Sequence, residues 1–230
     1  MSNHKYTIKD RSDDWKVRTR QGKEHPVHVT DISAVREHAE DLWDAGTSPT
    51  HDFDSRANER SREKFISDRI EGKVGEHVFK LFLERLGYSA EVDYDIYESK
   101  QVTDDADLKS IEGDDPTVSF DVKTTKKRNK WLAIRESIYH SHEPTDPFIL
   151  VLVNPDEVHN PPFTAEVVGW VEKKNLNIRL GRGERMYMPG DKSHKIGPPL
   201  KTDNRCIPVD SIQRRTKNEW EQFVQNRLVT

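Results

Sequence analysis

Two charged residues in one short stretch have the types and spacing of a hydrolytic site. Asp121 and Lys123 stand one residue apart in the sequence Phe-Asp-Val-Lys-Thr, residues 120–124. Alternate residues of a β-strand project from the same face, so a strand here would point both charged side chains the same way. The neighbouring apolar side chains, Phe120 and Val122, would then point into the core. A carboxylate and an ammonium side by side can be an ordinary surface ion pair, which contributes little to stability, so further residues have to decide the function.

A second carboxylate is expected beside the first. Asp107 lies fourteen residues before Asp121. Residues 106–111 and 118–124 both have strand composition, and the sequence Gly-Asp-Asp-Pro at 113–116 is typical of a turn between them. An antiparallel pairing of these two segments would bring Asp107 and Asp121 together near one end of a sheet.

Such a pair of carboxylates favours a divalent cation. Two carboxylates a few ångströms apart repel each other, and Mg²⁺ relieves the repulsion with oxygen ligands only. The carbonyl oxygen of Val122 offers a further ligand. Hydrolysis of a phosphodiester needs a cation at the scissile phosphate and a water as nucleophile. Lys123 could orient that water, deprotonate it if the lysine pKa were lowered, or clamp a phosphate oxygen.

These residues and an upstream helical pattern resemble the PD-(D/E)XK nuclease superfamily, which has the restriction-endonuclease-like fold. The matching motifs are Ala-Asp-Leu at 106–108 and Asp-Val-Lys at 121–123. GKVGEHVFKLFLERLGY, residues 72–88, is similar to the first core helix of that family, and the strands expected at 148–153 and 165–171 resemble its later strands. The resemblance covers about residues 71–171. Ala106 replaces the family's proline, which leaves Asp104 and Asp105 as rival candidates for the first aspartate.

The resemblance implies a role for each matched residue. Asp107 and Asp121 would ligate Mg²⁺, for which Mn²⁺ could substitute, and the Val122 carbonyl would complete the protein ligands. Glu76, in the helix, would assist the cation directly or through water, and Lys123 would act on the attacking water. The implied activity is that of a magnesium-dependent endonuclease acting on DNA, of the restriction type or of a phage or archaeal type.

Two other functions and a structural interpretation remain open on the sequence alone. The chain could be a non-cleaving relative that serves as a DNA-binding or assembly subunit, or a nuclease that acts on RNA or branched junctions. The charged residues could also be the ordinary surface charges of a strand. Cutting at a two-fold symmetric site would further imply a homodimer.

Basic residues directly after the motif are predicted to contact DNA. Lysine, arginine and threonine side chains bind phosphate oxygens well. A solvated hairpin tip is the alternative interpretation of the segment. The predicted DNA contacts are Thr124, Thr125, Lys126, Lys127, Arg128 and Lys130. A second basic, glycine-rich segment at 180–195 is either a loop that probes a groove or a mobile surface loop.

The order of helical and strand patterns predicts an α/β fold with a central mixed β-sheet flanked by helices. Helices are expected at residues 33–44, 55–86 and 211–228, and Gly87 should end the second of them. Gly72 and Gly75 predict a kink or a division in that helix. The unbroken apolar run at 148–153 is typical of a central buried strand. We expect a mostly helical N-terminal extension at 1–60 and a nuclease-like domain at 61–230, with basic C-terminal loops and a terminal helix.

Composition limits the remaining classes of protein. The chain has 230 residues with a net charge of −4, which argues mildly against binding nucleic acid by overall charge alone. The charges are segregated, with a net −8 over residues 91–115 and +6 over residues 122–135. The single cysteine, Cys206, excludes an internal disulfide framework. The sequence has neither a long apolar run nor an N-terminal apolar signal core, so we expect a soluble, cytoplasmic protein with no membrane partner.

Overall fold

The computed structural model describes residues 22–45, 61–96, 107–141 and 146–229 of the chain. Its main sheet has four strands in the order β1-β7-β6-β4. Their bounds are Pro26–Val29 for β1, Phe163–Val171 for β7, Phe148–Val153 for β6 and Asp121–Lys126 for β4. The β1/β7 and β7/β6 pairs are antiparallel and the β6/β4 pair is parallel, so the sheet is mixed, as predicted.

Strand β6 is the central strand that its composition predicts. All six of its residues are buried. Ile149 and Val151 pack in the core cluster that contains α3, whereas Phe148 and Leu150 pack in a second cluster on the opposite face. A strand buried on both faces needs apolar side chains at every position, which explains why this run does not alternate.

Helix α3, Arg62–Leu86, is one continuous helix of 25 residues. The hydroxyl of Ser61 caps its start by accepting a hydrogen bond from the Lys64 amide, and the helix ends at Gly87, whose φ is 100°. Left-handed backbone of this kind favours glycine, so the predicted end is confirmed. Of the two outcomes predicted at the internal glycines, division into two helices was wrong, because the helix is uninterrupted. Gly75 instead allows close packing, because a Cβ there would collide with the Thr124 hydroxyl on β4.

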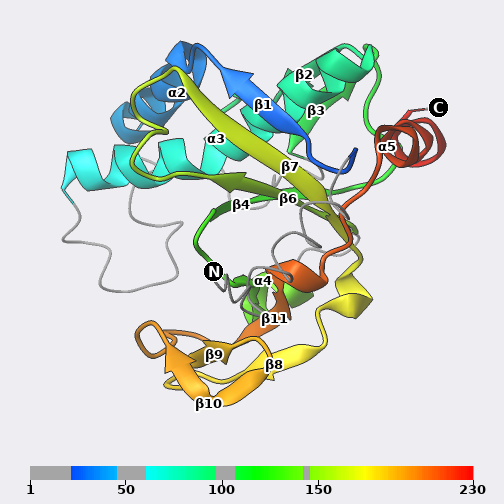
Figure 1. The fold of residues 1–230 in the computed structure, drawn as a ribbon. Coiled ribbons are helices and arrows are strands. Elements are labelled where there is room, and N and C mark those ends of the chain that lie inside the picture. The colour runs from blue at the N-terminus through cyan, green and yellow to red at the C-terminus, as the bar shows by residue number, and fades with distance from the viewer. Residues whose placement is uncertain (1–21, 46–60, 97–106, 142–145, 230) are drawn as a thin grey trace, which may run out of the picture.

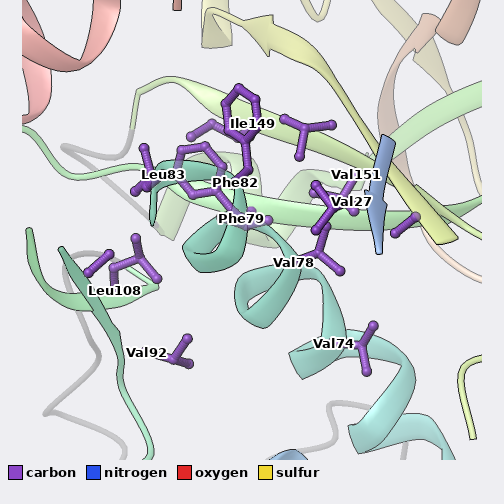
Figure 2. Packing of buried hydrophobic residues seen from close by; sticks show 14 of the residues in the cluster. Val27, Val74, Val78, Phe79, Phe82, Leu83, Val92, Leu108, Ile149 and Val151 are labelled. Atoms are coloured by element: carbon purple, nitrogen blue, oxygen red, sulfur yellow. The ribbon is translucent and has the colours of Figure 1, made fainter. Parts of the chain in front are cut away.

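The main core lies between α3 and the sheet (Figure 2). Figure 2 shows Val78, Phe79 and Phe82 of α3 directed toward Ile149 and Val151 of β6. Burial of large apolar side chains of this kind is the main stabilising contribution to a fold. Helix α2, Ser33–Asp44, has the predicted bounds and contributes two further buried residues, Val35 and Ala39.

The C-terminal helix closes this core and begins later than predicted. Helix α5 spans Lys217–Phe223, and residues 224–228 continue it as a π-helical turn. Thr216 and Glu219 form a capping box at its start, which fixes the first turn at this point. Trp220 is fully buried, with its ring centroid 5.1 Å from that of Phe82.

The antiparallel pairing predicted between residues 106–111 and 118–124 was wrong. Strand β3, Leu108–Ile111, pairs instead with β2, Ala90–Val92, in a separate two-stranded sheet. The predicted turn forms only a single bridge between Ile111 and Asp114. Pro116 lacks the N–H that a continued ladder would need. Strand β4 pairs with the wholly apolar β6, which buries it against the main core.

A smaller β layer lies below the main sheet in Figure 1. It contains a three-stranded sheet in the order β5-β11-β8 and a hairpin of β9 and β10. The bounds are Trp131–Arg135 for β5, Ile178–Leu180 for β8, Met186–Met188 for β9, Asp191–Ile196 for β10 and Asn204–Pro208 for β11. The basic C-terminal segment predicted as loops therefore carries four strands. They share a small core of Trp131, Leu180 and Cys206, and burial raises the pKa of the Cys206 thiol to about 11.

Part of the predicted N-terminal extension belongs to the main sheet. Val27 and Val29 of β1 lie opposite Ala165 and Phe163 of β7. The boundary predicted at residue 60 lies outside the described residues, as do residues 1–21. None of the helices in the described ranges has the length and apolar character that crossing a bilayer requires. Helix α4, Glu136–Ser141, completes the elements on the second face of the sheet, together with β5.

Candidate nucleic-acid and cation site

Asp107 reaches the edge of the main sheet through a side-chain hydrogen bond. Strand β4 is the last strand in the sheet order, and the Asp121 amide donates to Pro147 O, on the side of β6. Amides alternate in direction along a strand, so the Val122 amide faces the open side, where it donates to Asp107 Oδ2. The N–H and C=O of one residue share a direction, so the Val122 carbonyl also faces this open edge. The structure therefore brings Asp107 to β4 without the predicted strand pairing.

Asp121 and Lys123 project together from β4, as their spacing predicts. Their side chains form an ion pair between Asp121 Oδ2 and Lys123 Nζ. Asp121 is only 7 % exposed, and Phe120 and Val122 are buried in the main core. An ion pair this close to the core is shielded from solvent far more than an ordinary surface pair.

Glu76 lies on α3 directly after Gly75, the residue that lets the helix approach β4. Its side chain is 12 % exposed, and Oε2 lies 2.6 Å from Lys73 Nζ. Burial raises the pKa of Glu76 to about 8 even though the Lys73 ammonium acts in the opposite direction. Sequence reasoning missed Lys73. Its position three residues before Glu76, on the same helical face, was the signal that could have identified it.

The predicted catalytic residues act on one another electrostatically. Burial raises the pKa of Asp107 well above its usual range, and the charges of Glu76 and Asp121 raise it further. Burial alone would lower the pKa of Lys123, but the carboxylates of Asp121 and Asp107 outweigh it and the net shift is upward. Lys123 is thus held as an ammonium, which favours donation of hydrogen bonds over removal of a proton from water.

Tyr94 lies next to this group. Its ring centroid is 5.7 Å from Lys73 Nζ, and burial followed by the charge of Glu76 raises the pKa of the phenol to about 12. The Lys73 ammonium is therefore held between a carboxylate and an aromatic face. This arrangement restricts the position of Lys73 and, through it, that of Glu76.

The oxygen donors of this site fit a magnesium ion. Across the described residues, no three His, Cys, Asp or Glu side chains are grouped so that they could hold a metal ion together. Mg²⁺, however, is commonly bound by one or two carboxylates together with waters and substrate phosphates. Asp107, Asp121 and the Val122 carbonyl supply donors of this kind, and the mutual repulsion of the acids is what a cation relieves. The rival aspartates, Asp104 and Asp105, lie outside the described residues.

Three of the predicted DNA-contact residues are half-buried and have partners within the protein. The Thr124 hydroxyl donates to Gly72 O at 3.0 Å, which joins α3 to β4. The Thr125 hydroxyl accepts a hydrogen bond from the Asn129 side chain, and Lys126 Nζ lies 3.6 Å from a carboxylate oxygen of Glu71. These contacts shape the end of β4.

The other three predicted contacts are exposed. Lys127 Nζ donates to Thr164 O at 2.9 Å, which ties the turn to β7. Arg128 and Lys130 are exposed, and within the described ranges neither forms an ion pair. Two cations are therefore presented to solvent at the end of the strand that carries Asp121 and Lys123.

Comparison of the chain with family models, with curated proteins and with solved structures found no match in any of the three. The functional assignment consequently depends on the chemistry and geometry of the residues described above.

Proposed function

We propose that the chain is a metal-dependent nuclease that hydrolyses DNA phosphodiester bonds, with a PD-(D/E)XK-type site on a restriction-endonuclease-like fold. One observation carries the proposal. Asp107 is bound to the Val122 amide, between the two charged residues of the Asp-Val-Lys strand motif. The position of Glu76 and the mixed sheet with β4 at its edge support it further.

Each residue has a distinct role in this proposal. Asp107, Asp121 and the Val122 carbonyl would hold Mg²⁺ or Mn²⁺. When bound, such a cation would supply the positive charge that stabilises the phosphate in the transition state and would acidify a coordinated water. Lys123 donates a hydrogen bond that orients the attacking water or a phosphate oxygen. Glu76 lies on the cation side, where a bound cation would favour its ionised form, and Lys73 positions it.

Arg128 and Lys130 would hold the DNA backbone next to the reacting phosphate. Their contacts are electrostatic and independent of sequence, so binding should weaken steeply as salt rises. Hydrolysis adds the water oxygen to phosphorus and breaks the bond from phosphorus to the leaving oxygen of the sugar. Holding the backbone in place supplies much of the advantage of an enzyme over free solution for such a step.

A nuclease panel tests the proposal. Linear, supercoiled, single-stranded and branched DNA and an RNA are incubated with the protein in Mg²⁺, in Mn²⁺ and in EDTA. Cleavage in Mg²⁺ but not in EDTA, lost in Asp121→Asn and in Lys123→Met, is expected. Asp95→Asn and Lys109→Met are matched controls, because they change an exposed Asp–Lys pair, 2.8 Å apart, outside the site. Cleavage that persists in both site variants contradicts the proposal.

A second candidate function is that of a DNA-binding subunit that does not cleave. The observation in its favour is that Lys123 and Lys73 already contact two of the site's carboxylates, Asp121 and Glu76. Thermal unfolding with and without Mg²⁺ separates the two functions. A cation site stabilises the folded protein as Mg²⁺ is added. DNA binding without stabilisation by Mg²⁺ or Mn²⁺ and without cleavage would favour the second function.

A further inference from the structure

We propose that the β9–β10 hairpin is a recognition ribbon that enters the major groove of double-stranded DNA. The inference rests on the proposed function for the identity of its partner, and it adds the substrate class, duplex DNA, and the element that grips it. Figure 1 shows β9 and β10 at the end of the molecule farthest from the main sheet.

The outer strand of this ribbon is shaped for contact rather than for packing. Residues 191–195 of β10 are all exposed. The pairing passes from Asp191 opposite Met188 directly to Lys195 opposite Tyr187. Residues 192–194 therefore have no partner on β9 and form a bulge, because β9 advances by only one residue over the same stretch. Bulges of this kind redirect side chains away from a sheet, here those of Lys192 and His194.

The inner strand fixes the ribbon to the strand that follows the candidate site. Trp131 Nε1 donates to Tyr187 O at 2.6 Å, and the two ring centroids are 5.0 Å apart. Met186 and Ile196 pack against the same small core. Trp131 comes directly after the turn that presents Arg128 and Lys130. The ribbon is thus held by the polypeptide segment that leaves β4.

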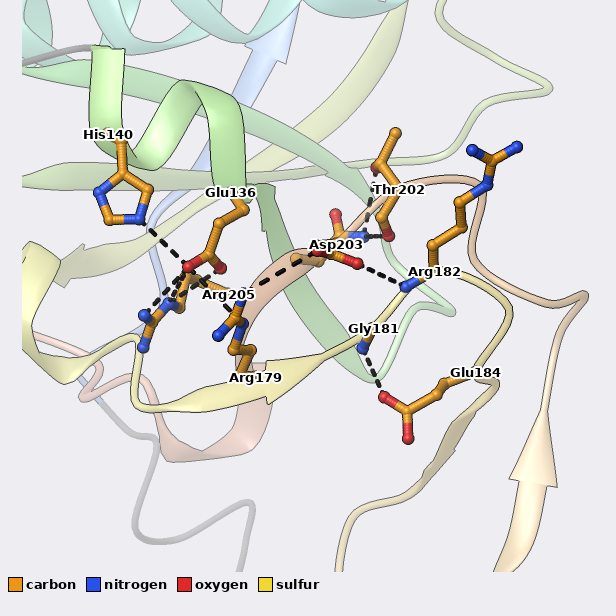
Figure 3. Close-up of polar contacts among 10 residues, drawn as sticks. Glu136, His140, Arg179, Gly181, Arg182, Glu184, Thr202, Asp203 and Arg205 are labelled. Carbon is orange, nitrogen blue, oxygen red and sulfur yellow. Dashed lines mark hydrogen bonds and ion pairs between the residues drawn. The ribbon is translucent and has the colours of Figure 1, made fainter.

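Three acidic side chains of the small β layer, next to the ribbon, already have partners in the protein (Figure 3). Glu136 accepts hydrogen bonds from Arg205 at 3.0 and 3.1 Å. Asp203 accepts from the Arg182 amide at 2.7 Å, and Glu184 accepts from the Gly181 amide. These carboxylates are used to fold the small β layer.

The basic side chains of the ribbon and of the loop before it, unlike these acids, are not used in contacts that fold the small β layer. Asp191, the only acid in β10, accepts hydrogen bonds from the amide and the hydroxyl of Ser193. Within the described ranges, the structure shows no ion pair for four exposed basic residues. These residues are Arg182, Arg185, Lys192 and Lys195. Residues 180–196 carry these four cations against the two acids Glu184 and Asp191, a net charge of +2 that an anionic partner would complement.

The shape of the ribbon selects duplex DNA among anionic partners. The major groove of B-form DNA admits a two-stranded β-ribbon, whereas the major groove of A-form RNA is too narrow for side chains to read. Lysines along the exposed strand would then lie beside the phosphates of the groove walls. The two cations of the turn after β4 would contact the same backbone.

Fluorescence anisotropy in EDTA tests the proposal without cleavage. A labelled DNA duplex is titrated with the full-length protein, with Lys192→Ser/Lys195→Ser, and with the control Lys64→Ser/Lys217→Ser. The control also removes two exposed lysines, one in α3 and one in α5, so the change in net charge is the same. The ribbon variant should bind about tenfold or more weakly at about 0.1 M salt. Its slope of log K against log salt should fall by about 1.8, while the control binds like the unaltered protein.

Each contrary result has a defined meaning. Equal affinity of the ribbon variant and the unaltered protein overturns the ribbon proposal, and so does equal competition by an RNA duplex of the same sequence. Cleavage assays in Mg²⁺ on the same proteins separate this proposal from the nuclease assignment. Ribbon-dependent binding without cleavage sustains the ribbon and refutes the nuclease, whereas cleavage with ribbon-independent binding does the reverse. Absence of duplex binding by the unaltered protein overturns the ribbon proposal.

Discussion

The carboxylate of Asp107 accepts a hydrogen bond from the backbone amide of Val122 at the open edge of β4. This contact joins the two-stranded β2/β3 sheet to the main sheet by a side chain, where a ladder was expected. It also explains how the charge of Asp121, in the main sheet, can raise the pKa of Asp107, next to the small sheet. This hydrogen bond can fix the position of the Asp107 side chain in either protonation state, because a protonated carboxyl group keeps an acceptor oxygen.

Asp107→Asn should abolish Mg²⁺-dependent cleavage without lowering stability in EDTA. The amide oxygen of asparagine can still accept from Val122, and one of three mutually repelling acids loses its charge. The rise in melting temperature expected on adding Mg²⁺ should disappear in this variant. Asp95→Asn serves as the control and should keep both responses. A melting temperature that still rises with Mg²⁺ in Asp107→Asn would argue against the proposed ligand.

Lys73→Met should destabilise the protein by about 1–3 kcal/mol, because it leaves the buried Glu76 carboxyl group without its polar partner. The matched change, Lys80→Met, breaks the more exposed 2.7 Å pair with Glu84 on the same helix and should cost less than about 1 kcal/mol. Urea unfolding at neutral pH measures both values. Adding Glu76→Gln to Lys73→Met should recover much of the loss. Equal costs for the two lysine variants would show that burial of the Lys73 pair has no energetic effect.

Gly75→Ala should destabilise the protein by about 1–3 kcal/mol, since the new methyl group collides with the Thr124 hydroxyl and forces α3 away from β4. Gly72→Ala is the control on the same helix. No atom lies within 4 Å of its added Cβ, and it should stabilise by about 0.5–1 kcal/mol. Thr124→Ala, combined with Gly75→Ala, should restore part of the stability. Chemical denaturation of the unaltered protein, of Gly75→Ala, of Thr124→Ala and of the double variant gives the coupling energy, and additive effects would contradict the predicted collision.

Stability should fall as the pH is lowered below about 6.5, in part because of two histidines. Burial lowers the pKa of His25 and of His38 in the folded protein. The unfolded chain therefore binds these protons more readily than the folded one, and the free energy of unfolding decreases with falling pH. The His25 ring nitrogen Nε2 lies 2.7 Å from Arg215 O, and His38 Nδ1 lies 3.0 Å from Tyr94 O.

The variants His25→Gln and His38→Asn keep these contacts and should each flatten the difference in stability between pH 7 and pH 5. Exposed His28→Gln is the control and should leave the profile unchanged. Thermal unfolding at several pH values measures the effect. The raised pKa of Glu76 has the opposite effect, because it increases the free energy of unfolding as the pH falls. Each variant is therefore compared with the unaltered protein at the same pH. A slope that is unchanged in both variants would exclude these histidines as its source.

Local sequence patterns were sufficient for most elements of the fold. The period of apolar residues located α2 and α3, and the unbroken apolar run located β6, because these patterns report directly which faces are buried. Pairing between strands was harder to predict. The turn at residues 111–114 forms locally, but whether the following strand returns to its predecessor depends on competition with a more apolar partner far along the chain.

The candidate site was predicted in part. Asp121 and Lys123 were placed on one face by their spacing alone. Lys73 was missed because an i, i+3 pair of charges on a helix is usually a surface feature, whereas the tertiary packing around α3 buries this one and places Tyr94 over Lys73. The hairpin of β9 and β10 was taken for a loop because its strands are short and mostly exposed. Exposed strands lack the apolar alternation by which a strand is recognised.

Strand β4 ends the main sheet, and an unprotected sheet edge is a template on which another molecule can add a strand and begin to aggregate. Asp107 occupies an amide of this edge, and the charges of Asp121 and Lys123 would have to be stripped of water before a foreign strand could dock. The same side chains that serve the proposed chemistry therefore also protect the protein against edge-to-edge association. Replacing all three by apolar residues would lower solubility together with activity.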